Sequence, residues 1–192
     1  GKYYRKRSSS FLIFSLKISR LLVITSTLCF SMLCSCTSSQ ISYDRYSLTE
    51  NISSSSFIVK RDLNVELNEV LNDGGIVLKT SNVSLLSANN HRWASSLKEQ
   101  LRVILNDALN KANVREDLSL NIYVSKFYGT TDGHCIIDMT VDSFKKGKAL
   151  YTKNYSFNRL QNKDGYQALV DTLKSGFESL SEEIANDLSM IK

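Results

Sequence analysis

Cysteine is the residue type whose placement most clearly indicates chemistry in this chain. The four cysteines are Cys29, Cys34, Cys36 and Cys135. The first three lie in or directly after an apolar segment, where a bacterial signal peptidase can leave a cysteine at the new N-terminus and its thiol can carry lipid. Bulky leucines directly precede Cys29 and Cys34, whereas small Ser35 precedes Cys36 and Leu33 lies three residues before it. We therefore predict lipidation at Cys36.

The other residues capable of chemistry do not form a recognisable site. Cys135 lies in the apolar pattern of a strand, which favours a buried structural thiol. His134 is next to it, but neighbouring side chains on a strand point to opposite faces, so the pair does not combine a nucleophile with a base. His91 has no second ligand at metal-binding spacing, and no phosphate loop or nucleophile elbow occurs. We predict no catalytic residue, no metal and no cofactor, and therefore no enzyme.

The segment before Cys36 has the pattern of a signal peptide over residues 1–35. Its six charged residues are all basic, and Leu21–Leu33 is a largely apolar run of 13 residues. A membrane-spanning helix needs about 20 such residues, so an uncleaved transmembrane anchor is the less favoured interpretation. Thr37 follows Cys36 in place of the Asp that tends to retain enteric-type lipoproteins in the inner membrane. We therefore expect a lipid-anchored protein of the outer membrane.

The net charge changes sign once this signal is removed. The whole chain has 24 Lys and Arg against 19 Asp and Glu, and removing the six basic residues of 1–35 leaves 18 against 19. The remainder has no basic stripe with interleaved aromatic residues, which binding to a nucleic-acid backbone would require. We therefore predict no nucleic-acid partner.

A polar stretch and a single domain follow the signal. Residues 36–56 are rich in serine, which predicts a lipidated N-terminus and a tether, although Tyr43–Leu48 has the pattern of a short strand. Residues 57–192 have the length of one domain. It begins with a strand pattern over Phe57–Leu67 and a strong turn signal at Asn72–Gly75.

The next segments predict further strands and two helices. Ile76–Leu86 gives one interrupted strand or two short ones, and Ala88–Ala94 reads as a connecting loop. Ser96 lies three residues before Glu99, the spacing of a capping box, and apolar residues then recur at helical spacing. From Asp164, apolar residues spaced by three or four form one stripe that predicts a long second helix.

Between these helices, three alternating segments over 118–159 predict an antiparallel meander. The combination predicts an α+β domain of two layers, in which a largely antiparallel sheet of about five strands is packed by two amphipathic helices.

Five parts of the chain carry a resemblance to a known family: Gly75–Ser81, Ala88–Ser95, Leu97–Leu109, Phe127–Gly129 with Asp132-Gly133, and Asp164–Tyr166. They resemble the PqiC/YmbA family of lipoproteins. The Asn-Asn-x-x-Trp-Ala stretch before the first helix is the most specific of them. The family usually has Pro, an aromatic residue and Leu where this chain has Asn68-Glu69-Val70-Leu71, and the chain contains no proline.

The resemblance implies a role rather than a reaction. It implies a non-enzymatic part of an intermembrane phospholipid transport system on the periplasmic face of the outer membrane. There the protein docks an MCE-type (PqiB-like) tunnel protein and self-associates as a ring. Asn89, Asn90 and Trp93 are the candidate contact residues. The preferred alternative for them is structural: Trp93 packs under the first helix while the asparagines cap backbone groups. The alternative function is that of another outer-membrane assembly lipoprotein, such as the lipopolysaccharide-assembly plug of a β-barrel.

Overall fold

The computed structural model describes residues 42–191 of the chain. Its strands are β1 (Asp44–Tyr46), β2 (Leu63–Leu67), β3 (Gly75–Lys79), β4 (Leu85–Trp93), β5 (Ser119–Thr130), β6 (His134–Lys145) and β7 (Lys148–Leu160). Its helices are the 3₁₀ segments η1 (Ser54–Phe57) and η2 (Glu69–Asp73) and the α-helices α2 (Leu97–Lys111) and α3 (Tyr166–Ser189).

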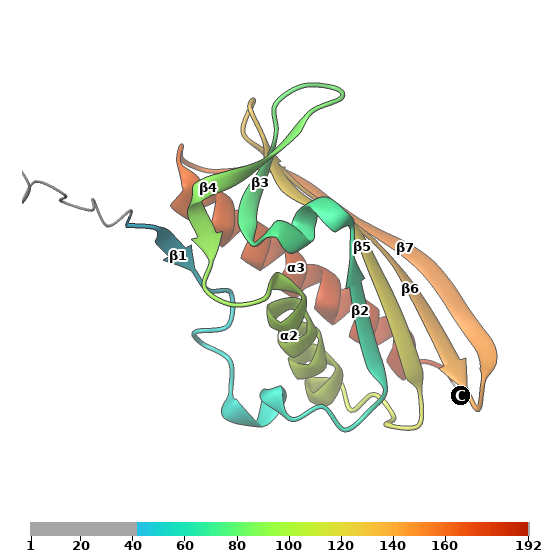
Figure 1. Cartoon of the computed structure of the whole chain (residues 1–192). Coiled ribbons are helices and arrows are strands. Elements are labelled where there is room, and N and C mark those ends of the chain that lie inside the picture. Colours follow the sequence, from blue (N-terminus) through green and yellow to red (C-terminus); the bar gives the residue numbers. More distant parts are fainter. Residues whose placement is uncertain (1–41, 192) are drawn as a thin grey trace, which may run out of the picture. The chain divides into compact units, whose positions relative to one another are not determined.

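β5 is the central strand of a seven-stranded sheet (Figure 1). Along one edge it pairs antiparallel with β6, which in turn pairs with β7, so the meander predicted over 118–159 is confirmed. Along the other edge, β2 pairs parallel with the first half of β5 and β3 with its last residues. β4 lies antiparallel to β3, and the short β1 lies outside β4 and parallel to it.

The two α-helices pack against each other and against one face of this sheet, where the buried apolar residues form one core cluster. The predicted α+β fold of two layers is therefore confirmed. The sheet has seven strands rather than about five, and three of its six pairings are parallel, although the two longest ones are antiparallel. The additional strands are β1, which has only three residues, and most of β4, whose pairing with β3 is irregular.

A β-bulge in the central strand changes which face its residues occupy. Val124 lies opposite Met139 and Lys126 opposite Asp138, so Ser125 is an extra residue on β5. Strict alternation after the buried Val124 would turn Phe127 toward solvent. The bulge instead turns Phe127 into the core, where its ring lies 6.1 Å from that of Phe177 on α3.

The prediction of a connecting loop over 88–94 is wrong, because these residues belong mainly to β4. Asparagine has a low strand propensity, and the segment lacks clear alternation. Backbone pairing on both edges decides its conformation: Arg92 lies opposite Gly75 of β3, and His91 lies opposite Asp44 of β1.

Residues 42–56, for which the sequence predicts a tether, pack against the domain. Leu48 is fully buried, and its backbone N–H donates to the Gln100 side-chain oxygen at 2.7 Å. The Asn106 amide donates to the Ser56 carbonyl oxygen at 2.8 Å. Two buried polar side chains of α2 thus fasten the segment that precedes β2.

Local capping differs from the sequence pattern at two helix starts. α2 begins after Ser96 as predicted, but Ser96 makes no side-chain hydrogen bond to the helix, and Glu99 pairs with Arg102 instead of forming a capping box. Where the PqiC/YmbA family usually has proline, the Asn68 side chain caps η2 by accepting a hydrogen bond from the Val70 N–H at 3.4 Å.

The turn predicted at Asn72–Gly75 is confirmed, and its two glycines serve different purposes. Gly74 ends η2 with φ of 82°, a left-handed conformation that residues with a Cβ rarely adopt. Gly75 lies directly against β4, where an added Cβ would overlap the Ala88 carbonyl oxygen and the Ser87 hydroxyl. The carbonyl is part of the strand backbone and has no freedom to turn aside.

We predict that Gly75→Ala lowers the free energy of unfolding by about 3 kcal/mol because it overpacks the β3–β4 pairing. Gly147→Ala is the matched control. It has φ of 76° and nothing within 4 Å of the added methyl group, so it should cost only about 1 kcal/mol. Urea unfolding followed by circular dichroism measures both, and equal losses would contradict the close approach at Gly75.

Candidate functional site

The three candidate contact residues on β4 have different surroundings. Trp93 is 4% exposed, and its ring lies 5.9 Å from that of Phe127. Asn89 and Asn90 are exposed, and neither side chain makes a hydrogen bond within the described part of the chain, so the backbone capping expected of them is not observed there. The asparagines therefore present their amide groups to solvent, whereas Trp93 belongs to the core.

His91, between Asn90 and Trp93, joins three elements. Its Nδ1 lies 3.1 Å from the Tyr46 hydroxyl and 3.4 Å from the Asp44 carboxylate, and its ring stacks on that of Tyr166 at 3.8 Å. Burial raises the pKa of both tyrosines above the usual value, so they stay protonated at neutral pH. The cluster holds β1 and the start of α3 against β4.

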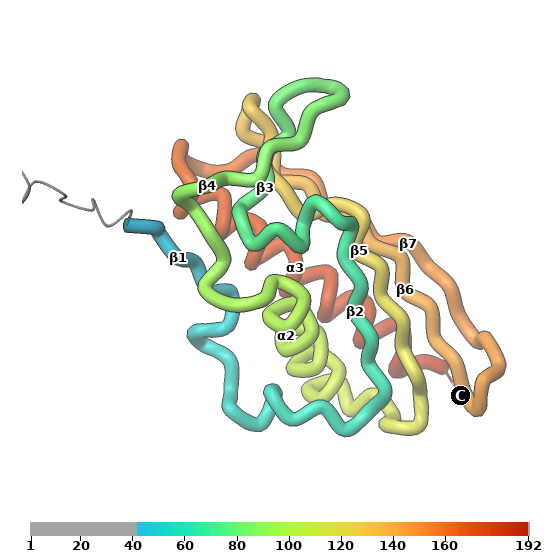
Figure 2. The backbone as a smooth tube through the Cα atoms, viewed as in Figure 1, coloured from blue at the N-terminus to red at the C-terminus, as the bar shows by residue number. Residues whose placement is uncertain are grey.

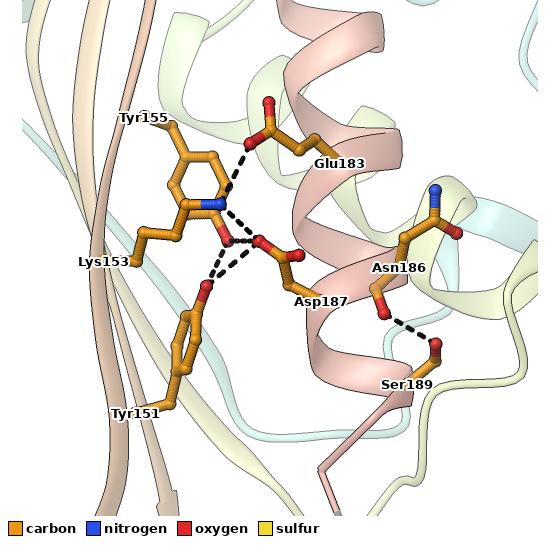
Figure 3. A network of polar contacts seen from close by, with 7 residues as sticks. All are labelled: Tyr151, Lys153, Tyr155, Glu183, Asn186, Asp187 and Ser189. Carbon is orange, nitrogen blue, oxygen red and sulfur yellow. Dashed lines mark hydrogen bonds and ion pairs between the residues drawn. The ribbon is translucent and has the colours of Figure 1, made fainter.

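A second polar cluster connects β7 to the end of α3 (Figure 3). One carboxylate oxygen of Asp187 accepts hydrogen bonds from Lys153 at 2.6 Å, Tyr155 at 2.8 Å and Tyr151 at 3.1 Å. Lys153 also donates to Glu183 at 3.0 Å. Figure 3 shows the three β7 side chains pointing toward the carboxylates of the helix.

The protonation states of this cluster are strongly set by its contacts. The hydrogen bonds from Lys153 and then from Tyr155 lower the pKa of Asp187. Burial, followed by hydrogen bonds to Tyr151 and Asp187, raises the pKa of Tyr155 well above its usual value, and the two carboxylates raise that of Lys153. Each of these three groups is therefore driven further from titration at neutral pH, which is the opposite of what proton transfer requires. The cluster therefore has a structural role, which is to join β7 to α3.

The adjacent His134 and Cys135 lie on opposite faces of β6, as predicted. Cys135 is fully buried beneath α3, and burial raises the pKa of its thiol. His134 is on the other face, with its Nδ1 2.7 Å from the Asn158 side-chain oxygen. Within residues 42–191, no three His, Cys, Asp or Glu side chains are placed to hold a metal ion. No described helix is both long and apolar enough to cross a bilayer.

A groove of about 550 Å³ runs between α2 and α3. Ile104 and Ala108 line it from one helix and Ala185 from the other. The Asp107–Lys111 ion pair, with atoms 2.6 Å apart, lies along its edge. The lining therefore mixes apolar side chains with charges of both signs, which does not mark a site for one class of ligand.

The sequence profile of the family described as ABC-type transport auxiliary lipoprotein component matches residues 61–185. The match extends from just before β2 into the last turns of α3. The chain belongs to this family. The intermembrane transport lipoproteins PqiC of Escherichia coli K12 and Shigella flexneri are each 28% identical to it over 141 residues, which cover 66% of this chain and 73% of the relative. The predicted resemblance is confirmed.

Solved structures share the architecture of this family member. The crystal structure of an uncharacterised protein has a TM-score of 0.65 and 28% identity, over 77% of this chain and 99% of the other. A protein of Xanthomonas campestris has a TM-score of 0.58 over 64% of this chain and 78% of its own, and its 11% identity shows likeness of fold alone.

The family is one of transport auxiliary components and not of enzymes, so the prediction of no enzymatic activity is confirmed. The family is also one of lipoproteins, which agrees with a membrane-associated protein. Cys36 lies outside the described residues, and its lipidation stays a prediction.

Two clusters are absent from the sequence-based predictions. The alternation of β7 places Tyr151 and Tyr155 on one face, but nothing in the pattern identifies Asp187 as their partner. His91 likewise meets Tyr46 and Tyr166, which are far from it in the sequence. Such contacts depend on topology, and local spacing carries no signal for them.

We predict that Trp93→Ala lowers the free energy of unfolding by about 3–5 kcal/mol, because it empties a core site beside Phe127. Asn90→Ala, on the same strand but exposed, should change it by less than about 0.5 kcal/mol. Urea unfolding followed by far-ultraviolet circular dichroism suits both variants, since Trp93 is the only tryptophan. An unchanged midpoint for Trp93→Ala would show that the ring does not support the fold.

We predict that Asp187→Asn destabilises the fold at pH 7 by about 1 kcal/mol, a modest value because the side chain is 31% exposed. Since the folded-state pKa of Asp187 is lowered, its contribution is complete above the unfolded value near 4 and disappears as the pH falls through the folded value. The difference from the wild type should therefore shrink between pH 5 and pH 2.

Urea unfolding across that pH range tests the prediction. Glu183→Gln is the control, because this carboxylate contacts only Lys153 in the cluster and is half exposed. A difference between wild type and Asp187→Asn that stays constant down to pH 2 would contradict the assigned role of the ionised carboxylate.

Proposed function

We propose that this protein is a lipoprotein of the outer membrane, facing the periplasm, that docks an MCE-type (PqiB-like) tunnel protein as part of an intermembrane phospholipid transport system. The observation that carries the proposal is the 28% identity over 141 residues with PqiC, an intermembrane transport lipoprotein. These residues cover 73% of that relative, so most of its length has a counterpart in this chain. Cys36 carries the lipid, and the role is one of assembly rather than catalysis.

Two exposed residues of β4 offer contacts to the tunnel protein. Asn89 and Asn90 each present an amide with donors and an acceptor, suited to hydrogen bonds with a partner's backbone. The strand is held in place by the contact of Trp93 with Phe127 and by the stacking of His91 on Tyr166. The surface is therefore positioned before a partner arrives, which lowers the entropic cost of binding.

A free sheet edge supports the ring-like self-association in this proposal. β7 runs over Lys148–Leu160, and no strand within the described residues pairs with its outer edge. Its outward backbone N–H and C=O groups are available to a strand of another subunit. A contact of this kind, repeated from one subunit to the next, closes a ring when the rotation permits it.

A pull-down of the tagged protein from detergent-solubilised native membranes tests the docking role. We expect an MCE-type protein to copurify, and Asn89→Ala with Asn90→Ala to reduce its recovery at least about fivefold by removing contact amides. Asn162→Ala, an exposed asparagine of the β7–α3 loop, is the control and should leave recovery unchanged. Recovery of a β-barrel protein, or of no partner, would overturn the proposal.

Lipidation is tested separately by metabolic labelling with palmitate. Cys36→Ala should abolish the label and cause the unprocessed precursor to accumulate, because the thiol at the cleavage point accepts the lipid. Cys34→Ala is the matched control and should be labelled like the wild type. Persistent label on Cys36→Ala would show that another cysteine is modified.

A further inference from the structure

The hairpin between β3 and β4 ends in an unusually apolar tip. Val83 is 98% exposed, Leu86 55% and Leu85 41%. Figure 2 shows the hairpin projecting from the sheet on the side of the β5–β6 turn, and Lys79 at its base lies opposite Thr130 at the end of β5. Exposed large apolar side chains are ordinary when scattered, but three within four residues at a projecting tip form a patch.

The backbone of the tip is partly satisfied by its own contacts. The Thr80 N–H donates to the Ser84 carbonyl oxygen at 3.0 Å, and the Val83 N–H donates to the Ser81 hydroxyl at 3.4 Å. A loop that pairs its own donors loses less when it leaves water for an apolar environment. Val83 therefore lies in a turn that these two hydrogen bonds close.

The charge around the tip favours a phosphate-bearing surface. From Gly74 to Lys98 the chain contains no Asp or Glu, and Lys79, directly below the tip, is basic. Lys79 makes no ion pair with any residue of the described range. An apolar tip with a basic residue at its base matches the layering of a bilayer, with acyl chains inside and anionic phosphates at the surface.

The direction of β1 relates this tip to the proposed lipid anchor. β1 runs parallel to β4, with Asp44 opposite His91 and Tyr46 opposite Trp93. The chain therefore enters β1 from the end of the sheet at which β4 leaves the hairpin. Only five residues lie between Cys36 and Ser42, and the six Cα–Cα steps between them span at most about 20 Å.

We propose that the β3–β4 tip enters the same bilayer that holds the lipid on Cys36, so that the domain contacts the membrane at two points. Val83, Leu85 and Leu86 lie at the boundary between headgroups and acyl chains, and Lys79 pairs with lipid phosphate. This inference rests on the anchorage in the proposed function. Two contacts fix the tilt of the domain, whereas a single lipid contact leaves it free.

The test uses the full lipidated protein in vesicles of phosphatidylethanolamine and phosphatidylglycerol. Val83→Cys carries a fluorescent label, and Lys146→Cys, in the exposed β6–β7 turn at the other end of the sheet, is the matched control. The other cysteines do not interfere, because Cys135 is buried and Cys36 is proposed to carry lipid after cleavage. Each label is exposed to aqueous iodide and, separately, to brominated acyl chains in the vesicles.

We expect brominated lipid to quench the label at position 83 at least about threefold more than that at 146, and iodide to show the reverse order. Equal quenching of both labels by each agent would overturn the inference. Shielding of position 83 from iodide without quenching by brominated lipid would also overturn it, because it would assign the tip to a protein partner. Protein that fails to float with the vesicles would instead contradict the lipid anchor itself.

Discussion

Hydrogen bonding along both edges of β5 connects the two halves of this sheet. β6 and β7 depend on one edge, and β2 and β3 share the other. Parallel pairing requires a long connection, and α2 lies within the one that leads from β2 to β5. β2, η2 and β3 follow one another in the same direction along β5, so together they occupy one side of it like a single strand interrupted by a 3₁₀ turn. The bulge at Ser125 then lets one strand turn Val124 and Phe127 toward the same core.

This arrangement gives the protein one packed face and leaves function to its surfaces. The helices cover the buried face of the sheet, and the groove between them mixes apolar and charged residues. The strongest polar cluster, around Asp187, holds charges and phenols in fixed protonation states. In the function proposed for this protein, contacts are made by exposed surfaces on β4, on the edge of β7 and on the β3–β4 hairpin rather than by reactive groups.

The sequence predicted the elements whose patterns are local and strong. The meander and both long helices have clear periods of two and of three to four residues, and their packing agrees with those periods. Only the start of β4 was predicted, within the interrupted strand over Ile76–Leu86, because its asparagines and its irregular pairing with β3 hide any alternation in the rest. The capping box predicted at Ser96 does not form, because the Glu99 side chain pairs with Arg102 instead. The clusters at His91 and Asp187 could not be predicted from the sequence, because their members come into contact only when segments that are distant in the sequence pair.

The two hydrogen bonds that join α2 to the residues before β2 lie where a pulling force on the N-terminal end of the domain would act. A pull on the N-terminal end acts along β1, whose hydrogen bonds to the parallel β4 resist sliding together rather than opening one at a time. After β1, the force would act on the hydrogen bond from Leu48 to Gln100 and on the one from Asn106 to Ser56. A pull transmitted from the proposed lipid anchor would therefore reach the first strand and α2 before it reached β5 and the meander.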